Sequence, residues 1–176
     1  RRSNTGQTYL FKKGYQLYNG KVTPKELIAK LKKKIMEYSP DDRFKEKMKI
    51  GGMNWYEFYG VKYFLYEYEE HLSKGKGVQM PWDDLLKKDK QDTIEHILPQ
   101  LPTREYWQER WKPEQIHSYM HDIGNLTLTF DNSVYGNKPF PDKRGMPGLA
   151  NCYTTSNLFQ EKALASYQDW TEKELL

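Results

Sequence analysis

The sequence predicts an α+β fold in which a small β unit is embedded in a mostly helical domain. Helix start signals precede several apolar-periodic stretches, whereas only two short runs, residues 93–100 and 124–129, are β-compatible. A length of 176 residues is enough to bury a core and leaves room for a helical annex. Aromatic residues make up 15% of the chain, which argues against disorder although only 37% of the residues are hydrophobic.

Charge and cysteine content limit the class of protein. The 28 basic and 24 acidic residues give a net charge of +4, which is compatible with a polyanionic partner without requiring one. Cys152 is the single cysteine, which excludes an internal disulfide or a cysteine-built zinc site and favours a reducing, cytoplasmic setting. No apolar run approaches the roughly 20 residues of a membrane span, and no signal peptide is visible. The chain begins without Met and ends in helix-like sequence, so we expect a fragment of a longer protein.

The first clear element is a helix from Thr23 to about Tyr38. Thr23 is a suitable N-cap, proline follows at the first helical position, and Glu26 is placed to close a capping box. Residues 1–20 lack clear periodicity and predict extended or loop structure. Lysines cover most of the helix outside its apolar face, and a solvated face is favoured over a DNA contact: Lys25, Lys30, Lys32, Lys33 and Lys34.

A second helix is expected from Trp55 to Leu72. Its aromatic and apolar residues surround nearly the whole circumference, which predicts burial on more than one side and favours core packing over a base-stacking platform. A short helix should follow from Trp82 to Lys90. We therefore expect residues 1–88 to form a helical annex that packs on a core made by residues 89–176.

Two more helices, Thr103–Trp111 and Pro113–Met120, are expected as an insertion (about 103–120) between the two β runs. His117 and His121 are four residues apart, a spacing that can place two imidazoles on one helix face. The intervening glutamate of a zinc-protease motif is absent, and the helix should end near Met120, so a metal role for this pair is not favoured.

The first β run carries Glu95 and His96 side by side and is stopped by Pro99. Adjacent residues on a regular strand point to opposite faces, so the two side chains share a site only if the strand is ending there, as the proline indicates. Taken alone, a solvated glutamate and a hydrogen-bonded histidine are the better interpretation of the pair.

The second run, Gly124–Thr129, alternates polar and apolar residues as a half-buried strand does. Asp131 and the two residues after it offer N-cap chemistry for a short helix. A strand–strand–helix unit would bring Asn125 and Asn132 to the same place as Glu95 and His96. The turn-rich, basic segment from residue 137 to 145 fits a loop that lies on phosphates. Further helices are expected from Thr155 or Ser156 and from Thr171.

Together the two runs resemble the HNH, or His-Me finger, nucleases, whose ββα-metal core has strands bearing Asp/Glu-His and Asn-Leu and then a helix opening on Asn or His. The pattern is most similar to the C-terminal domain of GmrSD-type modification-dependent restriction endonucleases. The resemblance is strong over residues 93–143 and weaker to residue 170, and before Asp92 it is one of layout only. It is carried by two segments and five single residues: Ile94–Gln100, Gly124–Leu128, Asn132, Asn137, Phe140, Lys143 and Trp170.

This resemblance implies a metal-dependent DNA endonuclease of a bacterial phage-defence system, leaving a 5′ phosphate and a 3′ hydroxyl. His96 would be the general base, because a neutral imidazole can deprotonate water near pH 7. Asn125 would orient its ring or the site. One Mg²⁺ or Mn²⁺, bound by Glu95 and by Asn132 or its neighbour Asp131, would stabilise the leaving oxygen. Four further residues are expected to bind phosphate or support the site: Asn137, Lys138, Lys143 and Arg144.

The implied partners are DNA and an N-terminal domain of the same polypeptide that senses modified DNA or binds nucleotide. This chain itself has no phosphate-cradling Gly-rich loop. Two alternatives stay open: a DNA-binding module without turnover, and a metal-dependent hydrolase that acts on RNA or a small phosphoester.

Overall fold

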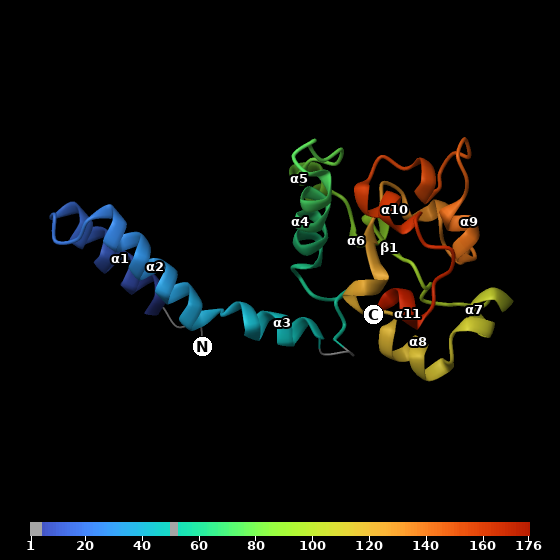
Figure 1. The fold of residues 1–176 in the computed structure, drawn as a ribbon, viewed down its shortest axis with the longest axis horizontal. Helices are drawn as coiled ribbons and strands as arrows, with labels where there is room; N and C mark the ends of the chain where they lie inside the picture. The colour runs from blue at the N-terminus through green and yellow to red at the C-terminus, as the bar shows by residue number, and fades with distance from the viewer. Residues whose placement is uncertain (1–4, 50–52) are drawn as a thin grey trace. The chain divides into compact units, whose positions relative to one another are not determined.

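The computed structural model describes residues 5–49 and 53–176, which form two compact units, Arg1–Ile50 and Gly51–Leu176 (Figure 1). Helix α4 (Val61–Ser73) contacts strand β2 (Leu126–Leu128) and helix α10 (Phe159–Leu164). Because of these contacts, α4 belongs to the same unit as the strands. The boundary expected at residue 88 therefore lies inside the second unit.

The first unit contains the helices α1 (Thr5–Tyr18), α2 (Pro24–Tyr38) and α3 (Asp41–Lys49). The predicted start of α2 is confirmed: the Glu26 amide donates to the Thr23 hydroxyl at 3.2 Å, and the Glu26 carboxylate accepts from the Thr23 amide at 2.8 Å. The loop predicted for residues 1–20 is wrong over Thr5–Tyr18, which is helix α1, while residues 1–4 lie outside the described part. Helix α1 contacts α2, and such tertiary contacts stabilise a helix whose own sequence carries little periodicity.

The second unit is built around two short antiparallel strands, β1 (Ile94–His96) and β2, with Glu95 opposite Thr127 and His96 opposite Leu126. This small sheet within a mostly helical chain confirms the α+β prediction (Figure 1). Both strands are shorter than the runs that predicted them. Regular pairing ends at His96, and the Ile97 amide then donates to the Asn125 carbonyl at 3.0 Å.

Helical segments surround the sheet. The predicted insertion is confirmed as helices α7 (Glu105–Arg110) and α8 (Pro113–Tyr119), and the predicted cap at Asp131 and the helix predicted from Thr171 are also found. The remaining segments are α5 (Trp82–Lys87), α6 (Lys90–Thr93), η1 (Ile123–Asn125), η2 (Asn132–Val134), α9 (Phe140–Arg144), η3 (Tyr153–Thr155) and α11 (Glu172–Leu175).

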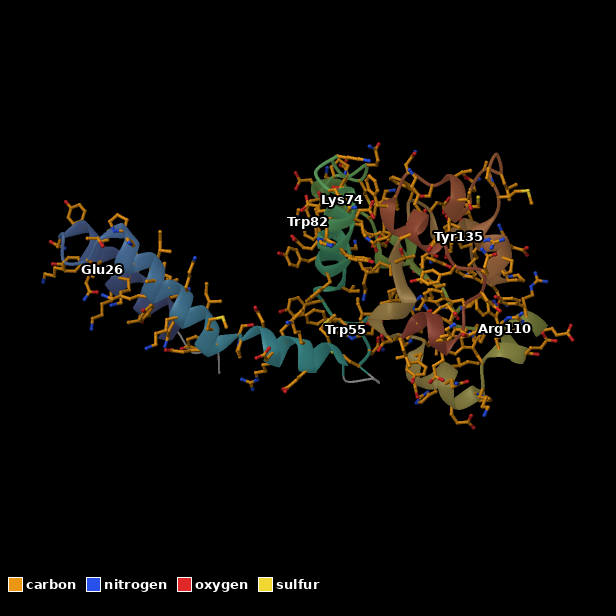
Figure 2. The ribbon with its side chains drawn as sticks, in the orientation of Figure 1. Glu26, Trp55, Lys74, Trp82, Arg110 and Tyr135 are labelled. Atoms are coloured by element: carbon orange, nitrogen blue, oxygen red, sulfur yellow. The ribbon has the colours of Figure 1, made fainter. Side chains whose placement is uncertain are left out.

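The predictions for the aromatic helix were wrong in two respects. Helix α4 starts only at Val61, so Trp55 lies in the turn before it (Figure 2). Its buried residues form one stripe, spaced four apart, while Tyr63 and Tyr68 are about half exposed. Within that stripe the Glu69 carboxylate accepts from the first two amides of α10, at 2.6 and 2.9 Å. This contact fixes which face of α4 is buried.

The main core lies beside the end of β1. Its buried members come from the loop after the strand, the insertion and the C-terminal segments: Ile97, Leu98, Trp107, Trp111, Tyr135, Phe140, Tyr153, Leu164 and Trp170. Arg110 of α7 (Figure 2) donates to both carboxylate oxygens of Asp169 at 2.9 Å, which ties the insertion to the C-terminal segment. Within residues 5–49 and 53–176, no helix has both the length and the apolar character needed to cross a membrane.

Candidate active site

Glu95 and His96 are adjacent on β1 but have separate side-chain partners. Both residues belong to the paired strand, in which neighbouring side chains alternate between the two faces. The Glu95 carboxylate contacts Lys143 of α9, whereas the His96 ring contacts His121, Gln100 and Tyr56. The sequence suggested that the strand ends at this pair, so that both side chains face one crevice. In the structure the pair is still within the paired strand, and the two side chains have different partners.

The Glu95 carboxylate is paired with the ammonium of Lys143 in the protein interior. Their exposed fractions are 2% and 0%. The Lys143 ammonium also donates to the carbonyl oxygens of His96 and Ile97, each at 3.0 Å. Burial raises the pKa of Glu95 to about 7, although Lys143 opposes this shift, and burial lowers the pKa of Lys143. Lys143 therefore supports the end of β1 from inside the fold, and its position does not fit the alternative role of phosphate binding.

The His96 ring is 5% exposed and is held by three side chains. Its Nε2 lies 3.0 Å from His121 Nδ1, and its Nδ1 lies 3.1 Å from Gln100 Nε2. The Tyr56 ring packs against it, with 4.6 Å between the ring centroids. Burial lowers the pKa of His96 to about 3, with smaller contributions from His121 and Lys143, so the imidazole is neutral at pH 7.

Asn125 connects three segments of the backbone through a fully buried amide. Its side-chain oxygen accepts from the Leu98 amide at 2.7 Å and from the Trp170 indole at 3.3 Å. Its side-chain nitrogen donates to the carbonyl oxygens of Leu98 and Met120, both at 2.9 Å. The amide is thus directed at backbone and indole groups and not at the His96 ring. Asn125 therefore holds the backbone at Leu98, two residues after His96.

The remaining predicted residues make hydrogen bonds to groups other than the His96 ring and the side chains around it, or are exposed. Asn132 donates to the Gln91 carbonyl at 2.9 Å, and its side-chain oxygen is buried without a hydrogen-bond partner. Asn137 donates to the Thr103 hydroxyl, and Arg144 donates to Gln168. Lys138 is exposed.

The comparison with protein families covers this whole region. The model of the C-terminal domain of GmrSD restriction endonucleases matches residues 38–176, from the last residue of α2 to the end of the chain. The chain belongs to this family. Membership makes it a nuclease module of a restriction endonuclease and makes DNA its substrate class. We found no match to the chain among curated proteins or solved structures.

In this GmrSD C-terminal domain, one of the two expected metal ligands, Glu95, is already paired with a cation of the protein. Lys143 already compensates the charge of Glu95, and three oxygens, from residues 95, 96 and 97, surround its ammonium. Among the described residues, no group of three or more His, Cys, Asp or Glu side chains is arranged to hold a metal ion. The unpartnered oxygen of Asn132 does fit a cation, because amide oxygens are ligands for Mg²⁺ and Mn²⁺.

Sequence reasoning missed three side chains around His96. Gln100 stands four residues after the histidine, and Tyr56 comes from the loop before α4. His121 was noticed only for its helical spacing to His117. The structure instead places His117 on an exposed face of α8 and His121 against His96, 25 residues away along the chain.

Proposed function

We propose that this domain is an HNH-type, metal-dependent DNA endonuclease in which His96 is the general base. The observation that carries the proposal is a neutral histidine ring at the end of β1, in a member of a restriction endonuclease family. The order β1, β2, η2 is compatible with the strand–strand–helix order of a ββα-metal core. A ring that is neutral at pH 7 keeps a lone pair that can accept a proton from water.

The proposed reaction is hydrolysis of one phosphodiester bond. His96 accepts a proton from water as the water oxygen attacks phosphorus, and the bond from phosphorus to the 3′ oxygen breaks on the opposite side. The departing 3′ oxygen takes a proton from solvent. The products are a 5′ phosphate and a 3′ hydroxyl, and the proton on His96 returns to solvent.

Other residues serve this reaction by holding the strand and the loop after it. Asn125 holds the backbone of Leu98 through two hydrogen bonds, and Lys143 donates to the carbonyl groups of His96 and Ile97. Lys138 is the exposed cation of the predicted set, so it is proposed to contact the DNA backbone. Asn137 and Arg144 bond Thr103 and Gln168, contacts that fit a supporting role.

One Mg²⁺ or Mn²⁺ ion, when bound, would supply positive charge for the leaving oxygen. Asn132 is the residue proposed to contact it, through its unpartnered side-chain oxygen. Glu95 would be free to do so only if Lys143 left its carboxylate.

We further propose that the domain is the cutting part of a modification-dependent, phage-defence enzyme of the bacterial cytoplasm. An N-terminal domain of the same polypeptide would sense modified DNA or bind nucleotide. The free, buried Cys152 is in keeping with a reducing compartment.

The test is incubation of the protein with supercoiled plasmid, with RNA and with bis(p-nitrophenyl) phosphate, each with Mg²⁺, with Mn²⁺ and with EDTA. The proposal expects nicking of plasmid that EDTA abolishes. Binding of plasmid without nicking would indicate a DNA-binding module without turnover. Preferential cleavage of RNA or of the small diester would overturn DNA as the substrate of this chain.

A further inference from the structure

We propose that His121 is a positioning residue for His96: it holds the His96 ring in the tautomer protonated at Nε2, so that Nδ1 is the basic nitrogen. This inference rests on the proposed function for its catalytic meaning, but the tautomer itself is measurable without activity. The observation behind it is the 3.0 Å contact between His96 Nε2 and His121 Nδ1.

The two ring nitrogens of His96 face different surroundings. Gln100 Nε2 lies 3.1 Å from His96 Nδ1, and an amide nitrogen is only a donor, so it requires a lone pair on Nδ1. A neutral imidazole carries one hydrogen, which must then be on Nε2 and be donated to His121 Nδ1. Both contacts are satisfied by this single tautomer.

The arrangement also leaves an approach to the basic nitrogen. Gln100 is an exposed side chain, whereas His121 is half-buried. Access to Nδ1 would require the exposed Gln100 side chain to rotate away, after which water and a phosphodiester would approach from that side. The His121 side stays closed and keeps the ring from turning.

His121 is itself fixed in place. Its carbonyl oxygen accepts from the Trp55 amide at 2.9 Å, which anchors its backbone to the loop before α4. Its ring stacks on Tyr56 with 5.9 Å between centroids and 19° between planes, and the same Tyr56 ring packs on His96. Burial lowers the pKa of His121, which favours a neutral ring, and with its hydrogen on Nε2 such a ring accepts at Nδ1. A partner held this firmly can define the orientation of His96.

The experiment compares the wild-type chain with His121→Ala and His121→Asn. Asparagine offers a side-chain oxygen near the place of the histidine Nδ1, so it can accept the hydrogen bond, whereas alanine cannot. The matched control is His117→Ala, a histidine exposed on α8. The first readout is the ¹⁵N shift pair of the His96 ring in histidine-labelled protein, assigned with a His96→Gln sample. The second is the kcat and KM for plasmid nicking.

The expected result is a single tautomer protonated at Nε2 in the wild type, in His121→Asn and in His117→Ala, and a mixture in His121→Ala. For nicking, we expect kcat of His121→Ala to fall about tenfold to a hundredfold with KM unchanged, and His121→Asn to regain most of it. Should His121→Ala fail to fold, His121→Leu, which also lacks an acceptor, takes its place in the tautomer measurement.

Three outcomes would overturn the inference: a wild-type ring protonated at Nδ1, the same tautomer in His121→Ala as in the wild type, or equal kcat values for His121→Ala and the wild type. A wild-type protein that never nicks DNA, yet shows the expected tautomers, would instead remove the proposed function and leave the pairing of the two histidines intact.

Discussion

The Lys143 ammonium bonds the Glu95 carboxylate and the carbonyl oxygens of His96 and Ile97, all away from solvent. Helix α9 thus holds the last residue of β1 and the first residue beyond it from inside the protein. The sequence suggested that Lys143 binds DNA or supports the site. In the fold its ammonium is buried and stabilises the strand that bears the proposed base.

Replacing Lys143 by methionine should therefore destabilise the fold. The variant leaves the Glu95 carboxylate buried and uncompensated, which costs about 3–5 kcal/mol of unfolding free energy. The loss should be smaller at pH 5 than at pH 8, because the raised pKa of Glu95 lets it take a proton as the pH falls. Urea unfolding followed by circular dichroism measures both values. Lys138→Met, at an exposed position, is the control. The double variant Glu95→Gln/Lys143→Met should recover most of the lost stability. Equal stability of Lys143→Met and wild type would refute the pairing.

The neutral state of His96 predicts a pH-dependent contribution to stability. Its pKa is about 3 in the folded protein and about 6.5 when unfolded. Between these values the unfolded state binds a proton that the folded state does not, so this contribution is full above pH 6.5 and is lost as the pH falls toward 3. The contribution of Glu95 to stability changes in the opposite direction: because its pKa is raised in the folded protein, this contribution is full below pH 4.5 and is lost as the pH rises toward 7.

A single variant separates the two effects. His96→Gln removes the histidine titration, so its stability relative to wild type should rise as the pH is lowered from 7 to 4.5, by at most about 1.4 kcal/mol per pH unit. Chemical unfolding across that range measures the difference. A flat difference for His96→Gln would mean that the ring is not held neutral.

Asn125 should matter for folding before it matters for catalysis. Asn125→Leu leaves four groups without this hydrogen-bond partner: the Leu98 amide, the carbonyl groups of Leu98 and Met120, and the Trp170 indole. We expect the free energy of unfolding to fall by at least about 3 kcal/mol. Asn125→Asp keeps the acceptor oxygen but turns its second oxygen toward the carbonyl groups of Leu98 and Met120 in a fully buried site, so it should also be destabilising. Thermal unfolding and tryptophan fluorescence report the change, with the exposed Asn157→Leu as control. A Leu variant as stable as wild type would contradict this structural role.

Asn132 should behave in the opposite way. Its side chain makes one hydrogen bond, to the Gln91 carbonyl, so Asn132→Ala should lose only about 1 kcal/mol of stability. If its unpartnered oxygen contacts the cation, the Mg²⁺ or Mn²⁺ concentration for half-maximal nicking should rise about tenfold or more in this variant. Asn132→Asp, which keeps an oxygen there, should stay closer to wild type. Metal titrations that coincide for all three proteins would exclude Asn132 as a ligand.

The parts of the fold that the sequence predicted are those that local interactions determine. The Thr23 capping box, the start of α8 at Pro113, the cap at Asp131 and the helix start at Thr171 involve residues two or three positions apart. Helix α1 was missed because its own sequence gives a weak pattern, and contact with α2 stabilises it. The single buried stripe of α4 was missed because many of its aromatic residues are partly exposed, which composition does not reveal.

The candidate site was predictable in part. Two short motifs brought His96 and Asn125 into the hypothesis, and family membership is confirmed. The partners of these residues were not predictable, because Lys143 lies 48 positions after Glu95 and His121 lies 25 after His96, so that only the fold joins them. Glu95 is a charged residue in a motif that suggested a metal ligand, and only its burial beside an ammonium points to another role.

The most direct test of the account is plasmid nicking by His96→Ala. The protein is assayed beside wild type and His117→Ala, with Mg²⁺ or Mn²⁺ and with EDTA, after circular dichroism has shown that all three are folded. The account predicts metal-dependent nicking by wild type and by His117→Ala, and a loss of about a hundredfold or more in the His96 variant. Nicking by folded His96→Ala at the wild-type rate would contradict it.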